Sequence, residues 1–516
     1  VAVGSESSEA NTTGNNNTAV GHKSLEANTT GGSNVAVGAF ALDANTTASD
    51  NTAIGIAALS ANTTGIDNTA VGAQALDANT TGTDNTALGR EALSTSTTGA
   101  QNTGIGRSSL KNLTTGSFNT AIGYHSMFGD VTGAHNVGLG RTTLNANTSG
   151  GYNTAVGNAA LASNTTASNN VAVGYNSLTA NTTGSENTAI GQDSLKTNTT
   201  AANNVAVGAN SLELNTTGAN NTAVGANSLA ANTTASSNTA VGKNAMNSNT
   251  TGTNSVAVGI QALNTSTTGS SNTACGAFAL NDNTTGASNN AFGESALANN
   301  TTGNDNNAFG VNCLVTLTTG SNNCSFGRSA LGFCTSGSNN AAFGHNALNK
   351  NTTAGSNTAV GAYTLVNNTT GTTNTAVGSE ALNDNTTASN NTAVGSLSLT
   401  KNTTGTSNTA TGVNALRLNT TANDNSAFGF GALQNNTTGS NNTAIGRQAL
   451  TVNSTGSTNT AVGSLALDAN TTGSENVAIG YGALTGHSSP EDCVAVGRGA
   501  LRQGTSGSNN TAVGAF

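Results

Sequence analysis

Glycine recurs at every seventeenth residue from Gly4 to Gly514, thirty-one times without an insertion or deletion. With this glycine as position one, the consensus of the repeat is G-x-x-[AS]-L-x-x-N-T-T-[GA]-x-x-N-[TV]-A-V. Separate domains tolerate changes in loop length, whereas a strict period indicates copies that stack in fixed register. Seventeen residues are too few for a helical-pair repeat, so the sequence predicts one coil of a β-solenoid per copy.

Two segments of each coil are candidate strands. Asn-Thr-Ala-Val-Gly has β-branched residues at alternate positions between turn residues, and Ala-Leu-x-x-Asn-Thr-Thr ends at Gly or Ala. The predicted fold class is therefore all-β, a single continuous parallel β-solenoid over residues 1–516 with 17 residues per coil and about 30 coils. Strand spacing makes thirty coils a rod of roughly 145 Å. Because the chain starts and ends within a repeat, we expect it to be part of a longer fibre.

Positions five, fifteen and seventeen are the predicted core. A strand sends alternate side chains to opposite faces, so fifteen and seventeen share one face. Phe occupies position seventeen in five coils, and position fifteen loses its Thr or Val in each of them. Close-packed interiors resist added bulk, so this exchange favours a shared confined space. The predicted core columns include Leu25, Leu42, Val20, Val37, Phe292, Phe309, Phe326 and Phe343.

Position sixteen stays small, with Ala in 28 of 31 copies. It would face away from that core, where a free surface would admit larger side chains. We expect a second chain to pack against this column, although a tight bend that excludes larger side chains is an alternative. The predicted inter-chain column includes Ala19, Ala36, Ala53 and Ala70.

Asparagine recurs at two positions of the coil. At position fourteen it occurs in 28 of 30 copies, which predicts either an amide ladder between coils or a preference of Asn for the turn. At position eight, Asn-x-Ser/Thr occurs in 22 of 30 copies, and each is formally an N-glycosylation acceptor. These acceptors include Asn11, Asn28, Asn45, Asn62 and Asn79.

Composition argues against several function classes. The fourteen Lys and Arg residues are scattered and the net charge is −9, so we expect no nucleic-acid partner. No stretch of eighteen apolar residues exists, which predicts no membrane span. The five His residues form no metal pair, and the five Cys residues do not fit a disulfide framework. We therefore expect no catalytic residues, metal or cofactor, and a protein that is not an enzyme.

The recurring Asn-Thr-Ala-Val-Gly and Asn-Val-Ala-Val-Gly segments resemble the head repeats of YadA-like trimeric autotransporter adhesins, which carry a similar Asn-Ser-Val-Ala-Ile-Gly core. The longer Ala-Leu-x-x-Asn-Thr-Thr-Gly-x-x-Asn-Thr-Ala-Val-Gly pattern is similar to repeats of bacterial and phage tail-fibre-domain proteins. The resemblance covers nearly the whole chain. It implies a left-handed parallel β-roll in a homotrimer, with the Ala column near the trimer axis. The head coils of that family are shorter, because Asn-Thr-Thr-Gly is added here, and no neck, stalk or anchor segment is recognisable.

These expectations favour a structural fibre or adhesin shaft at the cell surface, outside the cell or on a virion. It would self-associate as a homotrimer or filament and could meet a surface receptor or glycan. A phage tail fibre for host attachment is one alternative. An ice-binding solenoid is another, although positions nine and ten are adjacent and so give only single Thr columns.

Overall fold

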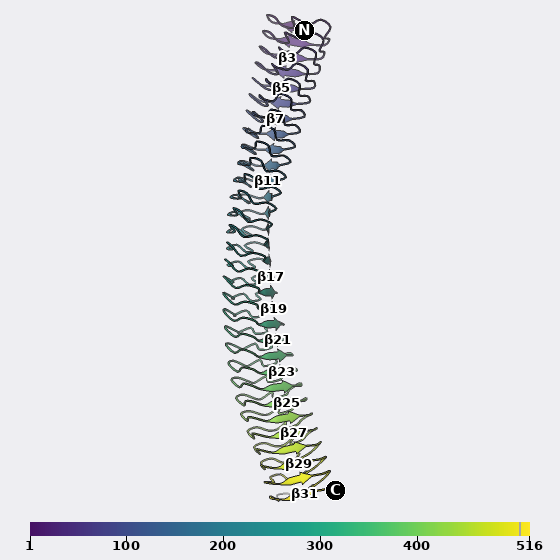
Figure 1. Cartoon of the computed structure of the whole chain (residues 1–516), viewed down its shortest axis with the longest axis vertical. Coiled ribbons are helices and arrows are strands. Elements are labelled where there is room, and N and C mark those ends of the chain that lie inside the picture. Colours follow the sequence, from purple (N-terminus) through teal and green to yellow (C-terminus); the bar gives the residue numbers. More distant parts are fainter. Residues whose placement is uncertain (505–506, 516) are drawn as a thin grey trace. The chain divides into compact units, whose positions relative to one another are not determined.

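The computed structural model describes residues 1–504 and 507–515, and every regular element in this part of the chain is a short β-strand. Thirty-one strands follow one another, one in each coil, and no helix occurs among the described residues. The all-β parallel solenoid that the repeat predicts is therefore confirmed (Figure 1). Its handedness stays a prediction.

The strands belong to two compact units, residues 1–255 and residues 256–516. The first unit carries β1 (Ala2–Val3), β2 (Thr18–Val20), β3 (Val35–Val37), β4 (Thr52–Ile54), β5 (Thr69–Val71), β6 (Thr86–Leu88), β7 (Thr103–Ile105), β8 (Thr120–Ile122), β9 (Val137–Leu139), β10 (Thr154–Val156), β11 (Val171–Val173), β12 (Thr188–Ile190), β13 (Val205–Val207), β14 (Thr222–Val224) and β15 (Thr239–Val241). The second unit carries β16 (Val256–Val258), β17 (Thr273–Cys275), β18 (Asn290–Phe292), β19 (Asn307–Phe309), β20 (Cys324–Phe326), β21 (Ala341–Phe343), β22 (Thr358–Val360), β23 (Thr375–Val377), β24 (Thr392–Val394), β25 (Thr409–Thr411), β26 (Ser426–Phe428), β27 (Thr443–Ile445), β28 (Thr460–Val462), β29 (Val477–Ile479), β30 (Val494–Val496) and β31 (Thr511–Val513). The single continuous domain stays a prediction.

Within each unit, a strand pairs in parallel with the strand one coil away. In the first unit, Ala19 of β2 lies beside Ala36 of β3, and Ala36 lies beside Ala53 of β4. In the second unit, Ala274 of β17 lies beside Ala291 of β18 in the same way. Each step is seventeen residues, so equivalent positions of the repeat form columns along the unit.

The second predicted strand is absent from the described coils, and that prediction is wrong. Positions three to seven turn instead, with Lys23 and Leu25 in the left-handed region at φ of 55° and 54°. Ordinary side chains rarely adopt this conformation, but a closed coil of seventeen residues needs sharp corners. The backbone still bonds to the next coil there, because the Leu25 N–H donates to the Ala41 carbonyl over 2.9 Å.

Close stacking explains the invariant glycine of position one. Gly72 has a φ of 136°, which L side chains rarely adopt, and a Cβ atom there would lie 2.6 Å from the carbonyl carbon of Gly89. The same close approach recurs along the column, for example at Gly89 and Gly106, so an alanine would collide with the coil that follows. This steric constraint explains why position one of the repeat is always glycine.

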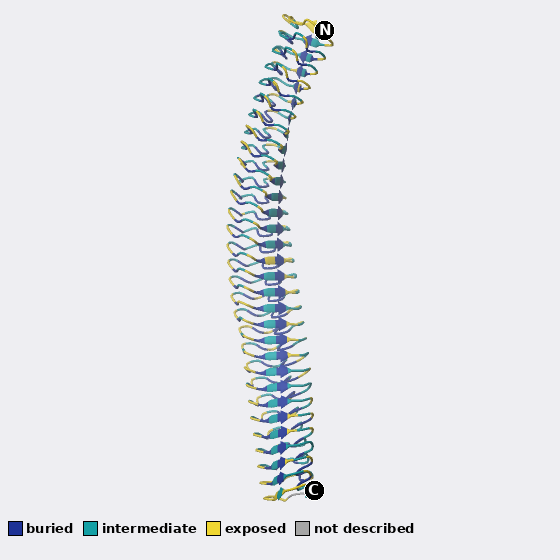
Figure 2. Ribbon diagram, turned by 45° about the vertical axis from the view of Figure 1, so that its right-hand side comes forward, coloured by how far each residue is buried: buried dark blue, intermediate teal, exposed yellow. Residues whose placement is uncertain are grey.

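The core is narrower than the sequence predicts. Leu25 and Leu42 of position five are fully buried, which confirms that column. Val20 and Val37 are only partly buried, and Phe292 and Phe343 are 37% and 38% exposed. Positions fifteen and seventeen therefore face outward, and their assignment to the core, including Phe309 and Phe326, is wrong. The predicted alternation is confirmed, but the buried residue is the middle one of each strand, as in β2 and β3, and Figure 2 shows a buried column along the strands.

The small column of position sixteen is part of the core. Ala19 is 1% exposed, and Ala36, Ala53 and Ala70 are 0% exposed in the single chain. A residue that is already enclosed by its own coil cannot contact a second chain, so the predicted inter-chain column is wrong. Position sixteen stays small because it faces the Leu of position five across a thin interior. Gly104, for example, would place a Cβ atom 3.3 Å from the Leu93 side chain.

Candidate functional site: asparagine ladders and the outward strand face

A ladder of buried asparagines occupies position eight. The Asn45 side-chain amide donates to Oδ1 of Asn28, one coil earlier, over 2.9 Å, and to the carbonyl of Ala48 over 3.0 Å. The Asn62 amide donates to Asn45 in the same way over 3.0 Å. Asn28, Asn45 and Asn62 are fully buried. Each side-chain amide thus donates one hydrogen bond to a backbone carbonyl of its own coil and one to the asparagine of the previous coil.

The ladder contradicts N-glycosylation at most of the predicted acceptors. Asn28, Asn45, Asn62 and Asn79 are 0% exposed, and the nitrogen that a glycan would modify donates two hydrogen bonds. Only Asn11, in the first coil, is exposed. The sequence did contain a signal for burial at this position, because Leu113, Leu317 and Cys334 also occupy it.

Position fourteen forms a second ladder. The prediction of an amide ladder between coils is therefore confirmed, in place of a mere preference of Asn for the turn. The Asn51 backbone N–H donates to Oδ1 of Asn34 over 3.0 Å, and the Asn51 side-chain amide donates to the carbonyl of Gly65 over 2.9 Å. The next copy repeats the pattern, since the Asn68 N–H donates to Oδ1 of Asn51 over 3.0 Å. The side chains therefore extend the interstrand bonding beyond the three-residue strands.

Asp130 is a weak point of the position-eight ladder. Leu113 holds this position one coil earlier and offers no amide partner. The Gly133 N–H donates to Oδ1 of Asp130 over 2.9 Å, as a backbone group does at a turn. Burial raises the pKa of the Asp130 carboxyl to about 7, against the opposing effect of the Gly133 hydrogen bond. A carboxylate in place of an amide thus makes this coil sensitive to pH.

The outward face of the strands carries the side chains of positions fifteen and seventeen. Phe309 lies in the Phe column with its ring centroid 4.7 Å from Phe292 and 4.4 Å from Phe326, and the rings are nearly parallel. Beside that column, the Asn290 amide donates to Oδ1 of Asn307 over 2.8 Å. Side chains on this face therefore contact their equivalents in neighbouring coils.

The cysteines divide between the two faces. Cys275, at position seventeen, is exposed, whereas Cys313 and Cys334 are buried, and all five cysteines are free thiols. Burial raises the pKa of the Cys313 and Cys334 thiols to about 11. These two residues therefore act as small core side chains and not as reactive groups.

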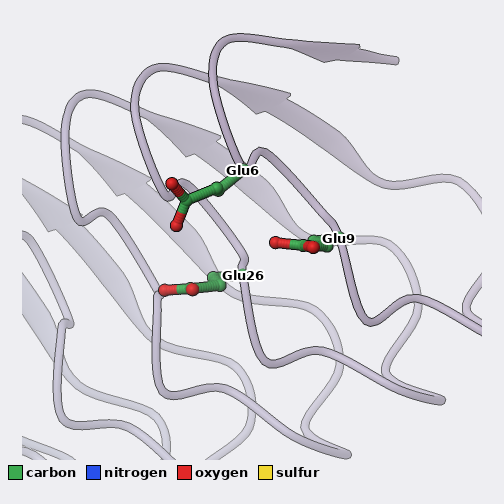
Figure 3. A group of neighbouring side chains, drawn as sticks. All are labelled: Glu6, Glu9 and Glu26. Carbon is green, nitrogen blue, oxygen red and sulfur yellow. The ribbon is translucent and has the colours of Figure 1, made fainter.

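Three glutamates gather at the start of the first unit, and sequence reasoning missed them. The carboxylates of Glu6, Glu9 and Glu26 lie within 4.8 Å of one another (Figure 3). The Lys23 ammonium lies 3.0 Å from both Glu6 and Glu26, and hydrogen bonds to Glu26 and Glu6 raise the pKa of Lys23. Glu6 and Glu26 are thus ion-paired with this lysine, and Glu9 lies beside them.

No long apolar helix that could cross a membrane occurs in residues 1–504 and 507–515. No model of a known protein family matches the chain, and no curated protein matches it. The resemblance of the repeat to adhesin heads and tail fibres therefore stays a hypothesis, as do the expected absences of catalysis, metal and cofactor.

Proposed function

We propose that this protein is a structural shaft, an extracellular or virion-borne fibre segment that spaces or presents another part of its assembly. The observation that carries the proposal is the pair of buried asparagine ladders, which link coil to coil together with the backbone. Most coils bury one large side chain, the Leu of position five, so stacking of neighbours supplies the stability, as in other one-dimensional repeats. Such a design produces length and stiffness.

The proposal extends to self-association, as a homotrimer or as a filament, and to a role without catalysis, cofactor or nucleic acid. A bacterial adhesin shaft and a phage tail fibre share this physical design, and a receptor or surface glycan would be met by a tip that the shaft carries. The resemblance of the repeat to both groups supports either setting.

Electron microscopy of the purified chain in negative stain tests the shaft. We expect thin rods whose length approaches 145 Å, which is thirty coils at the spacing of neighbouring strands. Compact round particles from a folded sample would contradict the proposal. The same grids measure rod width, which separates a single solenoid from a bundle of several.

Ice binding is a second candidate because of the outward side chains of position fifteen. This position holds Thr in 18 of 31 copies, and the Thr residues of neighbouring coils lie side by side on one face. Position seventeen is mostly aliphatic, so the face is not a paired Thr array. A thermal-hysteresis gap that Thr222→Lys lowers and Thr217→Lys does not would favour ice binding, whereas the shaft predicts no gap in either variant or in the parent.

A further inference from the structure

The outward columns of positions fifteen and seventeen, here called the strand face, form an uncharged strip on each unit, with Thr or Val in most copies at position fifteen and Val, Ile, Leu or Phe in most copies at position seventeen. No residue of either column is charged in any coil. Large apolar side chains are open to solvent along it, for example Ile54 at 40%, Leu88 at 46% and Ile445 at 42%. Soluble proteins rarely leave a continuous column of aliphatic and aromatic side chains, such as that of position seventeen, open to solvent, so the strand face has the character of an interaction surface.

The two borders of the strand face carry charges of opposite sign. The basic edge is position two, just after the strand, and its Lys and Arg residues are Arg90, Arg107, Arg141, Lys243, Arg328, Arg447 and Arg498. The acidic edge is position thirteen, just before the strand, and its acids are Asp50, Asp67, Asp84, Glu186, Asp305, Asp424, Glu475 and Asp492. All fifteen side chains are exposed, and both units carry both edges.

The separation of sign is nearly complete. Seven of the fourteen Lys and Arg residues of the chain lie on the basic edge, where Glu294 is the only acid. Eight of the 23 acids lie on the acidic edge, where no Lys or Arg occurs. Charges placed only for solubility would mix on both edges, so this distribution indicates a surface that meets a partner with the same polarity.

Both edges run as ordered columns beside the face. On the acidic edge, the rings of Phe118, His135 and Tyr152 stack in successive coils with centroids 4.7 Å apart. On the basic edge, the Arg141 guanidinium lies 6.0 Å from the ring centroid of Tyr124, one coil earlier. A partner that lies along the face therefore meets regular rows on both sides.

We infer that a second copy of this chain covers the strand face and lies parallel to the first, with the acidic edge of one copy against the basic edge of the other. A rotation about the long axis of the coil stack brings opposite edges together, for two copies or for more. An antiparallel arrangement brings acidic edge to acidic edge and basic to basic, which like-charge repulsion disfavours. Complementary charge thus favours a second copy of the chain on the strand face, and it favours the parallel over the antiparallel orientation.

The spacing of the charges supports a fixed register. Asp67, Asp84, Asp305, Asp424 and Glu475 are each followed, 23 residues later, by an arginine of the basic edge, as Asp305 is by Arg328. The apolar strand separates the two members, and none of these five pairs is an ion pair within the described chain. Across a parallel interface, the arginine of a second copy can reach the acid from the neighbouring coil.

The area of the face is adequate for stable association. A strip about 7 Å wide and 4.8 Å per coil amounts to roughly 500 Å² on each unit of about fifteen strands. Each unit can cover the same unit of a second parallel copy, and two such strips, counted separately, amount to roughly 1,000 Å² per copy, compared with about 800 Å² per partner in a standard protein interface. This inference depends on the proposed shaft only in that the stacked coils present the face.

The first experiment measures the mass of the full chain by sedimentation at micromolar concentration. The wild-type chain should be a multimer, and Val173→Lys/Val207→Lys/Val241→Lys should be a monomer with an unchanged circular-dichroism spectrum. A matched control, Thr166→Lys/Thr200→Lys/Thr234→Lys, adds the same charge at exposed positions of the same coils and should stay multimeric. A wild-type chain that is monomeric overturns the inference, and so do two triple variants of equal mass. Single rods in the micrographs would leave the shaft intact in either case.

A second experiment tests direction in a Cys275→Val/Cys324→Ala background, which removes the thiols of the strand face. Val71→Cys and Ile445→Cys chains carrying different tags are unfolded together, refolded together and treated with a short bismaleimide. Parallel copies cross-link Val71→Cys to itself and Ile445→Cys to itself. Predominant cross-links between the two variants show antiparallel copies and overturn the inference.

A third experiment tests the charged edges. Arg328→Glu should weaken association about two- to fivefold, since an exposed ion pair contributes little, and Asp305→Arg/Arg328→Glu should restore it. Lys350→Glu, which changes an exposed lysine away from both edges, should leave association unchanged. High salt should reduce the effect of Arg328→Glu. Failure of the double variant to recover, with both single variants folded, contradicts the edge-to-edge arrangement.

Discussion

The side-chain amide of Asn45 donates to the side-chain oxygen of Asn28 in the coil before it, over 2.9 Å, and both residues are fully buried. An amide both donates and accepts, so one residue type repeated at one position satisfies its own polar atoms without limit of length. The ladder therefore places polar side chains in the interior along with the buried Leu and Ala columns. This arrangement lets a chain with 3% aromatic residues and no Trp build a regular core.

Asn215→Ala should destabilise the first unit through the position-eight ladder. The Asn215 amide donates to Asn198 over 2.9 Å and accepts from Asn232 over 2.7 Å, so the substitution leaves two buried groups unsatisfied. We expect a loss of about 1–3 kcal/mol in the free energy of unfolding, measured by denaturant titration. Thr217→Ala, at an exposed position nearby, should change it by less than about 0.5 kcal/mol. Equal effects of the two substitutions would argue against the ladder.

Gly72→Ala should be far more damaging than Gly32→Ala. Gly72 has a φ of 136°, and an added methyl would lie 2.6 Å from the Gly89 backbone, whereas at Gly32 the nearest atom is 3.1 Å away. Strain of this kind costs about 1–3 kcal/mol before the collision is relieved. Hydrogen exchange of the coils around residue 72 should rise strongly in the first variant and little in the second. Unchanged exchange in Gly72→Ala would show that the coils are not in close contact there.

Asp130 should make the stability of the first unit depend on pH. Its pKa is raised by burial to about 7, above the ordinary value of 3.8, so the folded chain binds the proton more tightly than the unfolded chain. Stability is then greatest below about pH 4 for this group, falls as the pH rises toward 7, and levels off above that. Thermal unfolding between pH 4 and pH 8 measures this trend against other titrating groups.

Asp130→Asn restores the amide of the ladder and should remove that part of the pH dependence. At pH 8 we expect it to stabilise the unit by about 2–4 kcal/mol, since one pKa unit corresponds to about 1.4 kcal/mol. Glu9→Gln, an exposed carboxylate, should not flatten the profile. Parallel profiles for the wild type and Asp130→Asn would mean that this carboxyl is not buried.

Thiol labelling should distinguish the two faces of the coil. Cys313 and Cys334 are buried with pKa values raised to about 11, so at pH 8 few of these thiols are ionised and reagents cannot reach them. Cys275 is exposed and should react with maleimide in any sample in which the chain is monomeric. Mass spectrometry of digested protein locates the label. Rapid labelling of Cys313 in folded chain would place position four on the surface.

The period of the sequence determines the coil, but alternation does not determine which face is inside. Position five is Leu or Met in every copy except Ser8, and Leu25 is fully buried as predicted. Alternation separates Ala36 from Val37 but is symmetric between core and solvent, and the larger residue was placed in the core. The coil is too thin for that, so Ala36 is buried and Val37 is half-buried.

The sequence predicts only part of the candidate site. The position-fourteen ladder was one of two alternatives, and the hydrogen bond from Asn51 to Asn34 decides between them. Asn28 matches a glycosylation motif because Asn-Thr-Thr is part of the repeat. The apolar residues at the same position of other coils, such as Leu113, are the sequence signal for the burial that the structure shows. The charged edges could not be recognised from the sequence, because only the structure shows that positions two and thirteen border an outward face of the strands.

The most direct test of the account is the rise of the solenoid from one copy of the repeat to the next, measured by electron cryomicroscopy of the purified chain. We predict an axial rise of about 4.8 Å for every seventeen residues, the distance between neighbouring β-strands, with one short strand in each coil. A rise far from this value, or density for helices or for separate lobes, would contradict the stacking on which every other conclusion depends.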